Sequence, residues 1–357
     1  MESETPQSEN ENQTDQIVAS QSDGIQTREL KTGNFGEVRS DFEYFSKLAA
    51  VLIILAAVWF GSRVFGEKEN EMKNIYRPNE EIAASFLPGF EKGFLSPSAD
   101  FIPPVRKWEI EDPDFEAVSV FGFETVSGKL LFEKNADEPR SIASLSKLIT
   151  ALVIIERDRL DEEITVSQKA VETYGKMGSL VANEKISVES LLRAMLIESS
   201  NDAAVALAEK FSEKSGNNFI DLMNEKASHL NLKISHFSDP SGLTFENIST
   251  ARELAKIVET AAQYPILREI TTTQETDIHS ADGKYNHHLT NSDKLLKKYP
   301  EIILGKTGFI DEAGECMALA LKPPKGEGMI INIILGSTDR LLEMEKLILW
   351  EKQAFLW

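Results

Sequence analysis

Three short groups of residues in this chain have the types and spacings that catalysis by a serine hydroxyl requires. The first is Ser144-Leu145-Ser146-Lys147. Positions i and i+3 share one face of a helix, which places the hydroxyl of Ser144 beside the amine of Lys147. If burial and neighbouring cations lower the pKa of Lys147, its amine can accept the serine proton. Most such pairs are a helix cap and a solvated lysine, but here Lys147 enters an otherwise apolar stretch.

The second group is Ser199-Ser200-Asn201, followed by an alanine-rich segment. A hydroxyl and an amide at this spacing could relay a proton and hold a peptide group. The alternative is a helix kink in which the polar side chains only cap the backbone. A similar triplet, Ser215-Gly216-Asn217, has polar neighbours and is typical of an ordinary turn between helices.

The third group is Lys306-Thr307-Gly308, which follows the apolar residues 302–304. A lysine and a threonine on a strand could bind a carboxylate, and the glycine would let a substrate backbone approach closely. The tripeptide alone is uninformative, because Lys31-Thr32-Gly33 recurs in the polar N-terminal region.

The elements that would position these groups come in runs, with two strands, four helices, three strands and a closing helix, which is typical of an α+β domain. We expect helices at 144–157, 188–211, 218–229, 250–262 and 339–355, and strands at 116–124, 129–132, 302–304, 317–321 and 329–335.

The N-terminal third has a different composition. We expect residues 1–42 to form a disordered cytoplasmic tail, because they are polar and have few large apolar side chains. Residues 43–66 hold an apolar run with aromatic and basic residues at its edges, which predicts a transmembrane anchor. The alternatives are a buried core helix or a cleaved signal peptide. Residues 67–107 are expected to be a proline-containing stalk, and residues 108–357 a globular domain.

Composition excludes several classes of function. The formal net charge of −20 argues against nucleic-acid binding. The single cysteine, Cys316, excludes a disulfide within the chain and a cysteine-rich zinc site, and its apolar surroundings predict a buried strand residue. The five histidines include no His-Glu-x-x-His pattern, which disfavours a metallopeptidase, and we expect His287 and His288 on a loop.

Taken together, residues 116–357 resemble the low-molecular-mass penicillin-binding proteins, which are serine D-Ala-D-Ala carboxypeptidases. The resemblance extends beyond the triplets to the segments around them, which are 143–151, 191–204, 239–243, 249–254 and 305–316. It implies a β-lactamase/transpeptidase-like fold, in which an antiparallel sheet is flanked by helices and joined to an all-helical subdomain. The family more often has glycine where Ser200 stands, and we expect neither its β-rich second domain nor its C-terminal anchor here.

The resemblance also implies a role for each residue of the three motifs. Ser144 would be the nucleophile, Lys147 its base and Ser199 a proton relay, while Asn201 would hold the substrate amide. Lys306 would supply positive potential, Thr307 would bind the terminal carboxylate, and Gly308 would admit the substrate backbone. The backbone N–H groups of Ser144 and Phe309 would form an oxyanion hole. Arg340 is either a second carboxylate partner or a helix-start residue paired with Asp339. No metal or cofactor is expected.

The expected function is that of a membrane-anchored carboxypeptidase that removes the terminal D-alanine of peptidoglycan stem peptides outside the cytoplasm. β-Lactam antibiotics would be covalent inhibitors. The alternatives are a D,D-endopeptidase or a transpeptidase acting through the same acyl-enzyme. A class A β-lactamase is disfavoured, because no Glu-x-x-Leu-Asn pattern lies between Asn201 and Lys306. A non-catalytic penicillin-binding module and a serine esterase on the same fold remain further alternatives.

Overall fold

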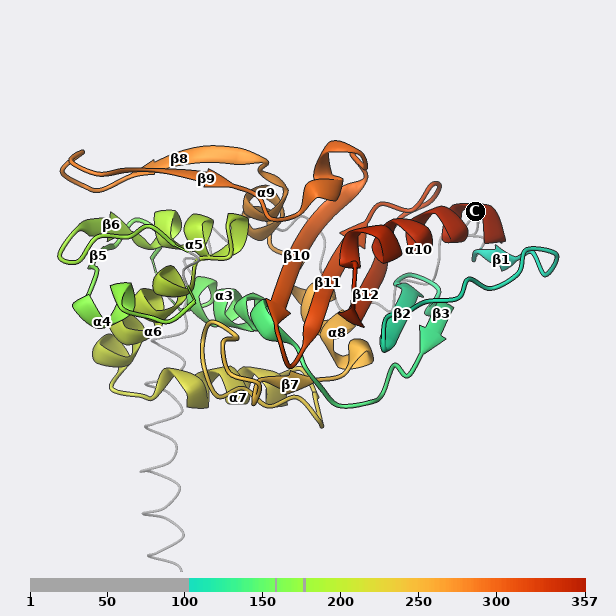
Figure 1. Cartoon of the computed structure of the whole chain (residues 1–357), viewed down its shortest axis with the longest axis horizontal. Coiled ribbons are helices and arrows are strands. Elements are labelled where there is room, and N and C mark those ends of the chain that lie inside the picture. The colour runs from blue at the N-terminus through green and yellow to red at the C-terminus, as the bar shows by residue number, and fades with distance from the viewer. Residues whose placement is uncertain (1–102, 158, 176–177) are drawn as a thin grey trace, which may run out of the picture. The chain divides into compact units, whose positions relative to one another are not determined.

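The computed structural model describes residues 103–157, 159–175 and 178–357 (Figure 1). The predicted tail at 1–42, the predicted anchor at 43–66 and all of the predicted stalk up to residue 102 lie outside this part of the chain. Within the described residues, no helix is both long enough and apolar enough to cross a membrane.

A five-stranded antiparallel sheet forms the centre of the domain. Its strands lie in the order β10 (Ile302–Ile310), β11 (Gly314–Leu321), β12 (Ile330–Ser337), β2 (Ser119–Glu124) and β3 (Lys129–Lys134). The predicted strands at 302–304, 317–321 and 329–335 are therefore present. However, β10 continues to Ile310, because its backbone pairs with β11 as far as the register Ile310↔Gly314. Pairing with a neighbouring strand thus carries the polar triplet Lys306–Gly308 into the sheet.

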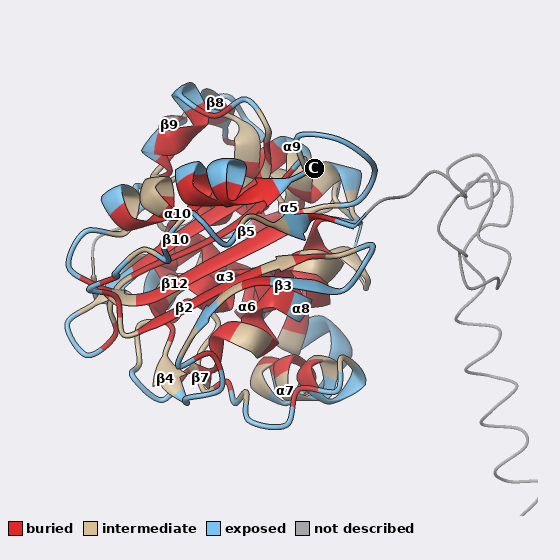
Figure 2. Cartoon of the chain, turned by 90° about the vertical axis from the view of Figure 1, so that its right-hand side faces the viewer, coloured by how far each residue is buried: buried red, intermediate tan, exposed pale blue. Residues whose placement is uncertain are grey.

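Helices cover both faces of this sheet and confirm the predicted α+β architecture. On one face α10 (Arg340–Ala354) packs through Met344 and Leu347 against Met317 and Ile334. On the other face lies α8 (Ala251–Ala261), beside the remaining helices (Figures 1 and 2). Figure 2 shows β2, β10 and β12 as largely buried between these two layers. Cys316 lies in β11 with no exposed surface, as predicted.

A group of helices packs beyond β10 and surrounds α3 (Lys147–Ile155), of which residues 147–154 are all buried. The other members are α4 (Gln168–Val171), α5 (Val188–Ile197), α6 (Asn201–Ser215), α7 (Phe219–His229) and α9 (Pro265–Thr272). The chain breaks between α5 and α6 at residues 198–200, so the helical pattern at 188–211 forms two helices. The three motif segments meet where α3, α6 and β10 come together.

Short strand pairs and 3₁₀ turns complete the domain. They are β1 (Val105–Arg106) with β13 (Phe355–Leu356), β4 (Arg140–Ser141) with β7 (Ile248–Ser249), β5 (Glu163–Thr165) with β6 (Lys185–Ser187), β8 (Glu275–His279) with β9 (Asn286–Thr290), η1 (Ala143–Ser146) and η2 (Lys294–Lys297). The prediction that His287 and His288 lie on a loop is wrong, since both are in β9. His287 is buried there, and its Nε2 lies 2.9 Å from the Glu184 carboxylate.

Candidate active site

Ser144 lies in the 3₁₀ turn η1, and Lys147 is the first residue of α3. The predicted helix at 144–157 therefore begins with a tighter turn, which still brings residues i and i+3 together. The Lys147 Nζ is 2.8 Å from the Ser144 Oγ. The residue before the serine, Ala143, has a left-handed φ of 48°, an uncommon conformation for alanine that often marks a functional turn.

Lys147 is fully buried, and its Nζ has three hydrogen-bond acceptors. They are the Ser144 Oγ at 2.8 Å, the Asn201 Oδ1 at 2.7 Å and the Ser241 carbonyl at 2.5 Å. Burial lowers the pKa of Lys147 to about 7, although Asp239 and Asp202 favour its charged form. Once neutral, the amine can donate to Asn201 and Ser241 and direct its lone pair at Ser144, which is the arrangement that a general base needs.

Ser199 lies at the break between α5 and α6 and has a left-handed φ of 69°. Its buried Oγ accepts a hydrogen bond of 2.8 Å from Lys306 Nζ. Ser200 caps α6, because its Oγ accepts the Ala203 N–H at 3.1 Å. The two adjacent serines therefore have different roles: Ser200 caps α6, and Ser199 contacts Lys306 in β10.

Asn201 connects the base to a loop. Its Oδ1 accepts from Lys147, and its Nδ2 donates to the Gly175 carbonyl at 2.7 Å. The side chain is 4% exposed, which fixes the orientation of its amide. The structure thus forms two hydrogen-bonded groups, one of Ser144, Lys147 and Asn201 and one of Ser199 and Lys306. The two groups are neighbours, because the charges of Lys147 and Lys306 interact.

The strand β10 presents Lys306 and Thr307 on opposite faces, as consecutive residues of a strand must. Lys306 is 1% exposed, and its Nζ donates to Ser199 and to the Thr307 carbonyl at 2.8 Å. Burial, together with the positive charges of Lys147 and Arg340, lowers the pKa of Lys306 well below its ordinary value. The Thr307 Oγ1 donates to Ser292 Oγ at 2.6 Å on the other face of the strand.

Gly308 and Gly242 pack tightly against the nucleophile turn. A Cβ added to Gly308 would lie 3.0 Å from the Ser144 nitrogen, so β10 directly borders the turn. A Cβ on Gly242 would lie 2.0 Å from the Ala143 carbonyl oxygen, and Gly242 has a φ of 79°. Glycine is therefore required at position 242, and a small residue is favoured at position 308.

The remaining predicted site residues lie at the edge of this group. Phe309 follows Gly308 in β10 and is 56% exposed. The Arg340 Nη1 donates to the Gly308 carbonyl at 3.0 Å and lies 3.9 Å from Glu315. No Arg340–Asp339 ion pair is found among the described residues, where Asp339 Oδ1 instead accepts the Leu342 N–H at the start of α10. Arg340 therefore faces β10.

The second triplet, Ser215–Asn217, lies away from the site at the end of α6. Its serine Oγ donates to the Phe211 carbonyl at 2.8 Å, and Gly216 terminates the helix with a left-handed φ of 69°. The interpretation of this triplet as a turn is confirmed.

Several contributors were missed because they act through the backbone or from a distant part of the chain. The Ser241 carbonyl binds Lys147, and its turn is held by Asp239, whose Oδ1 accepts from the N–H groups of Ser241 and Gly242, each at 2.7 Å. Burial raises the pKa of Asp239, but these hydrogen bonds outweigh it and leave the pKa below its ordinary value. Ser292, next to Thr307, was also missed. In the described residues we find no group of three acidic, histidine or cysteine side chains that could hold a metal ion.

Comparison with known proteins points to one family. A family profile described as D-alanyl-D-alanine carboxypeptidase matches residues 107–338. The chain is 33% identical over 230 residues to the D-alanyl-D-alanine carboxypeptidase DacF of Bacillus subtilis, covering 62% of this chain and 58% of that protein. It is 34% identical over 196 residues to a D-alanyl-D-alanine endopeptidase of Pseudomonas aeruginosa, covering 54% of this chain and 63% of that one. The chain thus spans less than two thirds of these relatives.

A solved structure shares the arrangement of elements. The DD-transpeptidase of Streptomyces K15 superposes with a TM-score of 0.63 at 28% sequence identity, and the match covers 68% of this chain and all of that one. The sheet, its flanking helices and the helical group therefore form a transpeptidase-like fold.

Proposed function

We propose that this chain, which belongs to the D-alanyl-D-alanine carboxypeptidase family of serine peptidases, removes the terminal D-alanine of peptidoglycan stem peptides. The reaction would proceed through an acyl-enzyme. The observation that carries the proposal is the buried Lys147, whose Nζ lies 2.8 Å from the Ser144 hydroxyl. A lysine that can become neutral beside a serine is the combination that converts a weak hydroxyl nucleophile into a reactive one.

In the first step the Ser144 Oγ attacks the carbonyl carbon of the penultimate D-alanine while its proton passes to Lys147 Nζ. The negative oxygen of the tetrahedral intermediate would be bound by the backbone N–H groups of Ser144 and Phe309. The C–N bond then breaks as the leaving amine takes a proton from Ser199. The proton that Lys147 took from Ser144 would replace it, which leaves Lys147 neutral again. The Ser199 oxygen accepts a hydrogen bond from Lys306 in the structure. Water finally hydrolyses the ester and frees Ser144.

The terminal carboxylate of the substrate would be bound at β10. Thr307 offers a hydroxyl, and Lys306 and Arg340 supply positive charge to the same region. Asn201 Nδ2, which donates to Gly175 in the structure, would turn to the carbonyl of the stem peptide. Arginine is well suited to a carboxylate, because its planar group can donate two parallel hydrogen bonds.

Mass spectrometry of a β-lactam adduct tests this assignment. We expect one covalent adduct that maps to Ser144 and is lost in Ser144→Ala. The matched variant is Ser146→Ala, because Ser146 lies in the same turn but directs its Oγ to the Ala143 carbonyl at 2.9 Å. An adduct that persists in Ser144→Ala, or one that maps to Ser146, would exclude Ser144 as the nucleophile.

The same acyl-enzyme could serve an endopeptidase or a transpeptidase, and the relatives carry both carboxypeptidase and endopeptidase names. Digestion of purified muropeptides separates these activities. Release of free D-alanine from monomeric pentapeptides would support the carboxypeptidase, whereas cleavage only of cross-linked dimers would favour the endopeptidase. Formation of new cross-links would favour the transpeptidase.

We also propose that residues 43–66 anchor the chain in the membrane, with residues 108–357 outside the cytoplasm. The support is the apolar run between basic and aromatic residues, and the location of peptidoglycan outside the membrane. Protease added to intact cells should digest the catalytic domain and spare residues 1–42. Digestion of the N-terminal tail with protection of the catalytic domain would mean the opposite topology.

A further inference from the structure

Asp293 is a buried carboxylate for which the proposed mechanism has no use. It is 3% exposed and caps η2, since its Oδ1 accepts the Leu295 N–H at 2.8 Å. Its backbone N–H donates to Asn291 Oδ1, also at 2.8 Å. The second oxygen, Oδ2, is buried without a hydrogen-bond partner among the described residues. Such an oxygen is costly to bury, so a compensating interaction is expected nearby.

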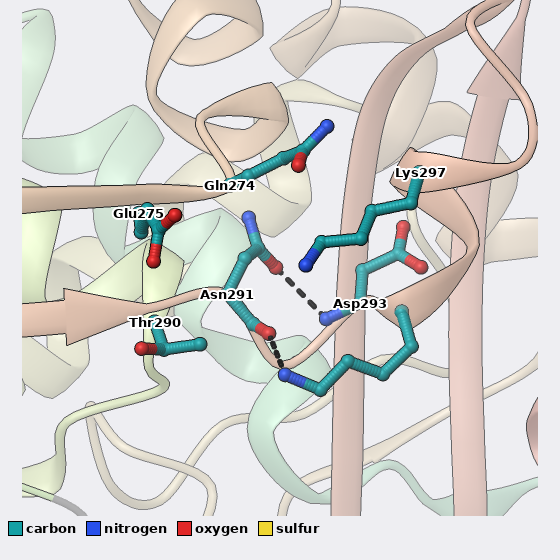
Figure 3. A pocket seen from close by; sticks show the side chains of 7 residues that line it. Gln274, Glu275, Thr290, Asn291, Asp293 and Lys297 are labelled. Atoms are coloured by element: carbon teal, nitrogen blue, oxygen red, sulfur yellow. Dashed lines mark hydrogen bonds between the residues drawn. The ribbon is translucent and has the colours of Figure 1, made fainter.

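The unpartnered oxygen lies against the strand that carries the carboxylate-binding residues. A Cβ placed on Gly305 would be only 2.7 Å from Asp293 Oδ2, so the carboxylate rests on β10 one residue before Lys306. The preceding residue, Ser292, accepts the hydrogen bond from Thr307. Figure 3 shows Asn291 and Asp293 joined by a hydrogen bond beside the small cavity that they line. This segment therefore contacts Gly305 and Thr307 on the α10 side of the sheet, and the Lys306 side chain leaves the strand on the other face.

Lys306 needs a compensating negative charge that its hydrogen bonds do not supply. Its Nζ donates to a serine hydroxyl and to a backbone carbonyl, both of which are neutral. Two cations, Lys147 and Arg340, lie close enough to disfavour its charge, whereas Asp293 is the carboxylate that favours it. A buried cation without an opposing charge tends to lose its proton.

Asp293 is largely ionised at pH 7 and above. Burial raises its pKa to about 6, while the Leu295 N–H and the charges of Arg340 and Lys306 limit the rise. Three further charged groups, Glu275, Lys294 and Lys297, line the cavity beside Asp293, but all three are exposed and are therefore screened by water.

We propose that Asp293 is a positioning residue, the counter-charge that keeps Lys306 protonated while Lys147 is neutral. This inference rests on the proposed function, in which two neighbouring buried lysines must hold opposite protonation states at one pH. Lys147 must lose its proton to act as a base, and Lys306 must keep its own to attract the substrate carboxylate. Asp293 caps η2 and lies against β10 at Gly305, the residue before Lys306, and therefore acts on that member of the pair.

The test is the pH dependence of acylation by a penicillin, whose carboxylate would bind at Lys306 and Thr307. In the wild type we expect a bell-shaped profile, with a rising limb from Lys147 and a falling limb as Lys306 loses its proton. In Asp293→Asn, which keeps the η2 cap, the falling limb should move to lower pH by at least about one unit, reducing acylation at pH 9 about tenfold or more. The rising limb should stay in place.

Three controls separate this role from a structural one. Asp282→Asn removes an exposed carboxylate at the β8–β9 turn and should leave both limbs unchanged. Acylation by a neutral organophosphorus reagent, which has no carboxylate, should be much less affected by Asp293→Asn. In the Lys306→Arg background, where the cation cannot lose its proton, the falling limb should be absent whether residue 293 is aspartate or asparagine.

A folded Asp293→Asn enzyme whose pH profile superposes on that of the wild type would overturn the inference and leave the proposed function intact. A wild-type enzyme that forms no adduct at Ser144 at any pH would instead defeat the proposed function. If Asp293→Asn does not fold, nitrogen NMR of the wild-type lysine side chains gives the answer. The signal of Lys306 should shift as Asp293 titrates near pH 6, and the absence of that shift would also overturn the inference.

Discussion

At the scale of residues, the protonation of Lys147 is expected to control the rate of acylation. Because its pKa is lowered to about 7 and the base must be neutral, the rising limb of the acylation profile should follow a single ionisation near that value. Lys147→Arg stays charged and should lose about 10²–10⁴-fold in rate. Stopped-flow acylation by a chromogenic β-lactam between pH 5 and 9 measures both effects. A Lys147→Arg enzyme that acylates at the full rate would remove Lys147 from this role.

A second prediction concerns the different roles of the serines in the two triplets. Ser199 Oγ is buried and bonded to Lys306, whereas Ser215 Oγ only closes the last turn of α6. Ser199→Ala should therefore slow acylation by about 10²–10⁴-fold, while Ser215→Ala should change the rate and the stability little. Second-order acylation rate constants and melting temperatures of both variants distinguish a loss of acylation from a loss of stability. Comparable rate losses in the two variants would contradict the assignment.

At the scale of elements, the nucleophile turn depends on its contact with Gly242. An alanine there would bring a Cβ within 2.0 Å of the Ala143 carbonyl, at a φ of 79°. Gly242→Ala should destabilise the fold by about 2–4 kcal/mol and displace Ser144, lowering acylation strongly. Gly283→Ala is the matched control, because it has a φ of 69° but open space around it.

Gly283→Ala should lose only about 1 kcal/mol and keep its acylation rate. Denaturant melts measure the loss of stability, and β-lactam labelling measures the displacement of Ser144. Together they distinguish backbone strain at the glycine from the steric contact with Ala143. Equal losses of labelling in the two variants would show that the left-handed backbone, and not the contact with Ala143, matters at position 242.

Much of the site could be predicted because its residues are set by local context. Ser144 and Lys147 are three residues apart in a buried helical segment, and Ser199 follows the apolar stripe of α5. The extent of β10 could not be predicted, because its polar half is a strand only through its pairing with β11. The Ser241 carbonyl was missed for another reason, since any residue type can supply a backbone oxygen.

Asp293 illustrates a contact that no local pattern reveals. It sits beside lysines in sequence and looks like an exposed helix cap, which is the role that its Oδ1 does have. Its second oxygen becomes important only because the fold places β10 against it, at Gly305.

At the scale of the whole molecule, buried carboxyl groups should give stability a definite pH dependence. Glu351 in α10 is fully buried, bonded to Asn332 at 2.9 Å, and burial raises its pKa to about 8. The folded state therefore holds this proton more tightly than the unfolded state, and the associated stability is lost as pH rises from about 4.5 to 8. Asp293, with its raised pKa, acts in the same direction at lower pH.

Glu351→Gln should flatten the decline in melting temperature between pH 5 and 8 and should be about 1–3 kcal/mol more stable than the wild type at pH 8. Glu345→Gln on the same helix is the control. The pKa of Glu345 is lowered by Lys298 and Tyr299, so its titration lies below this range and the slope should be unchanged. A Glu351→Gln enzyme with the wild-type slope would mean that other groups cause the decline.

The left-handed backbone of Ser199 has a consequence for the stability of variants at this position. Glycine adopts its φ of 69° without steric cost, whereas both glycine and alanine lack the hydroxyl that contacts Lys306. Ser199→Gly should therefore be about 1 kcal/mol more stable than Ser199→Ala, although both lose this contact. Serine at this position therefore combines a strained backbone, which lowers stability, with a hydroxyl that the proposed reaction needs.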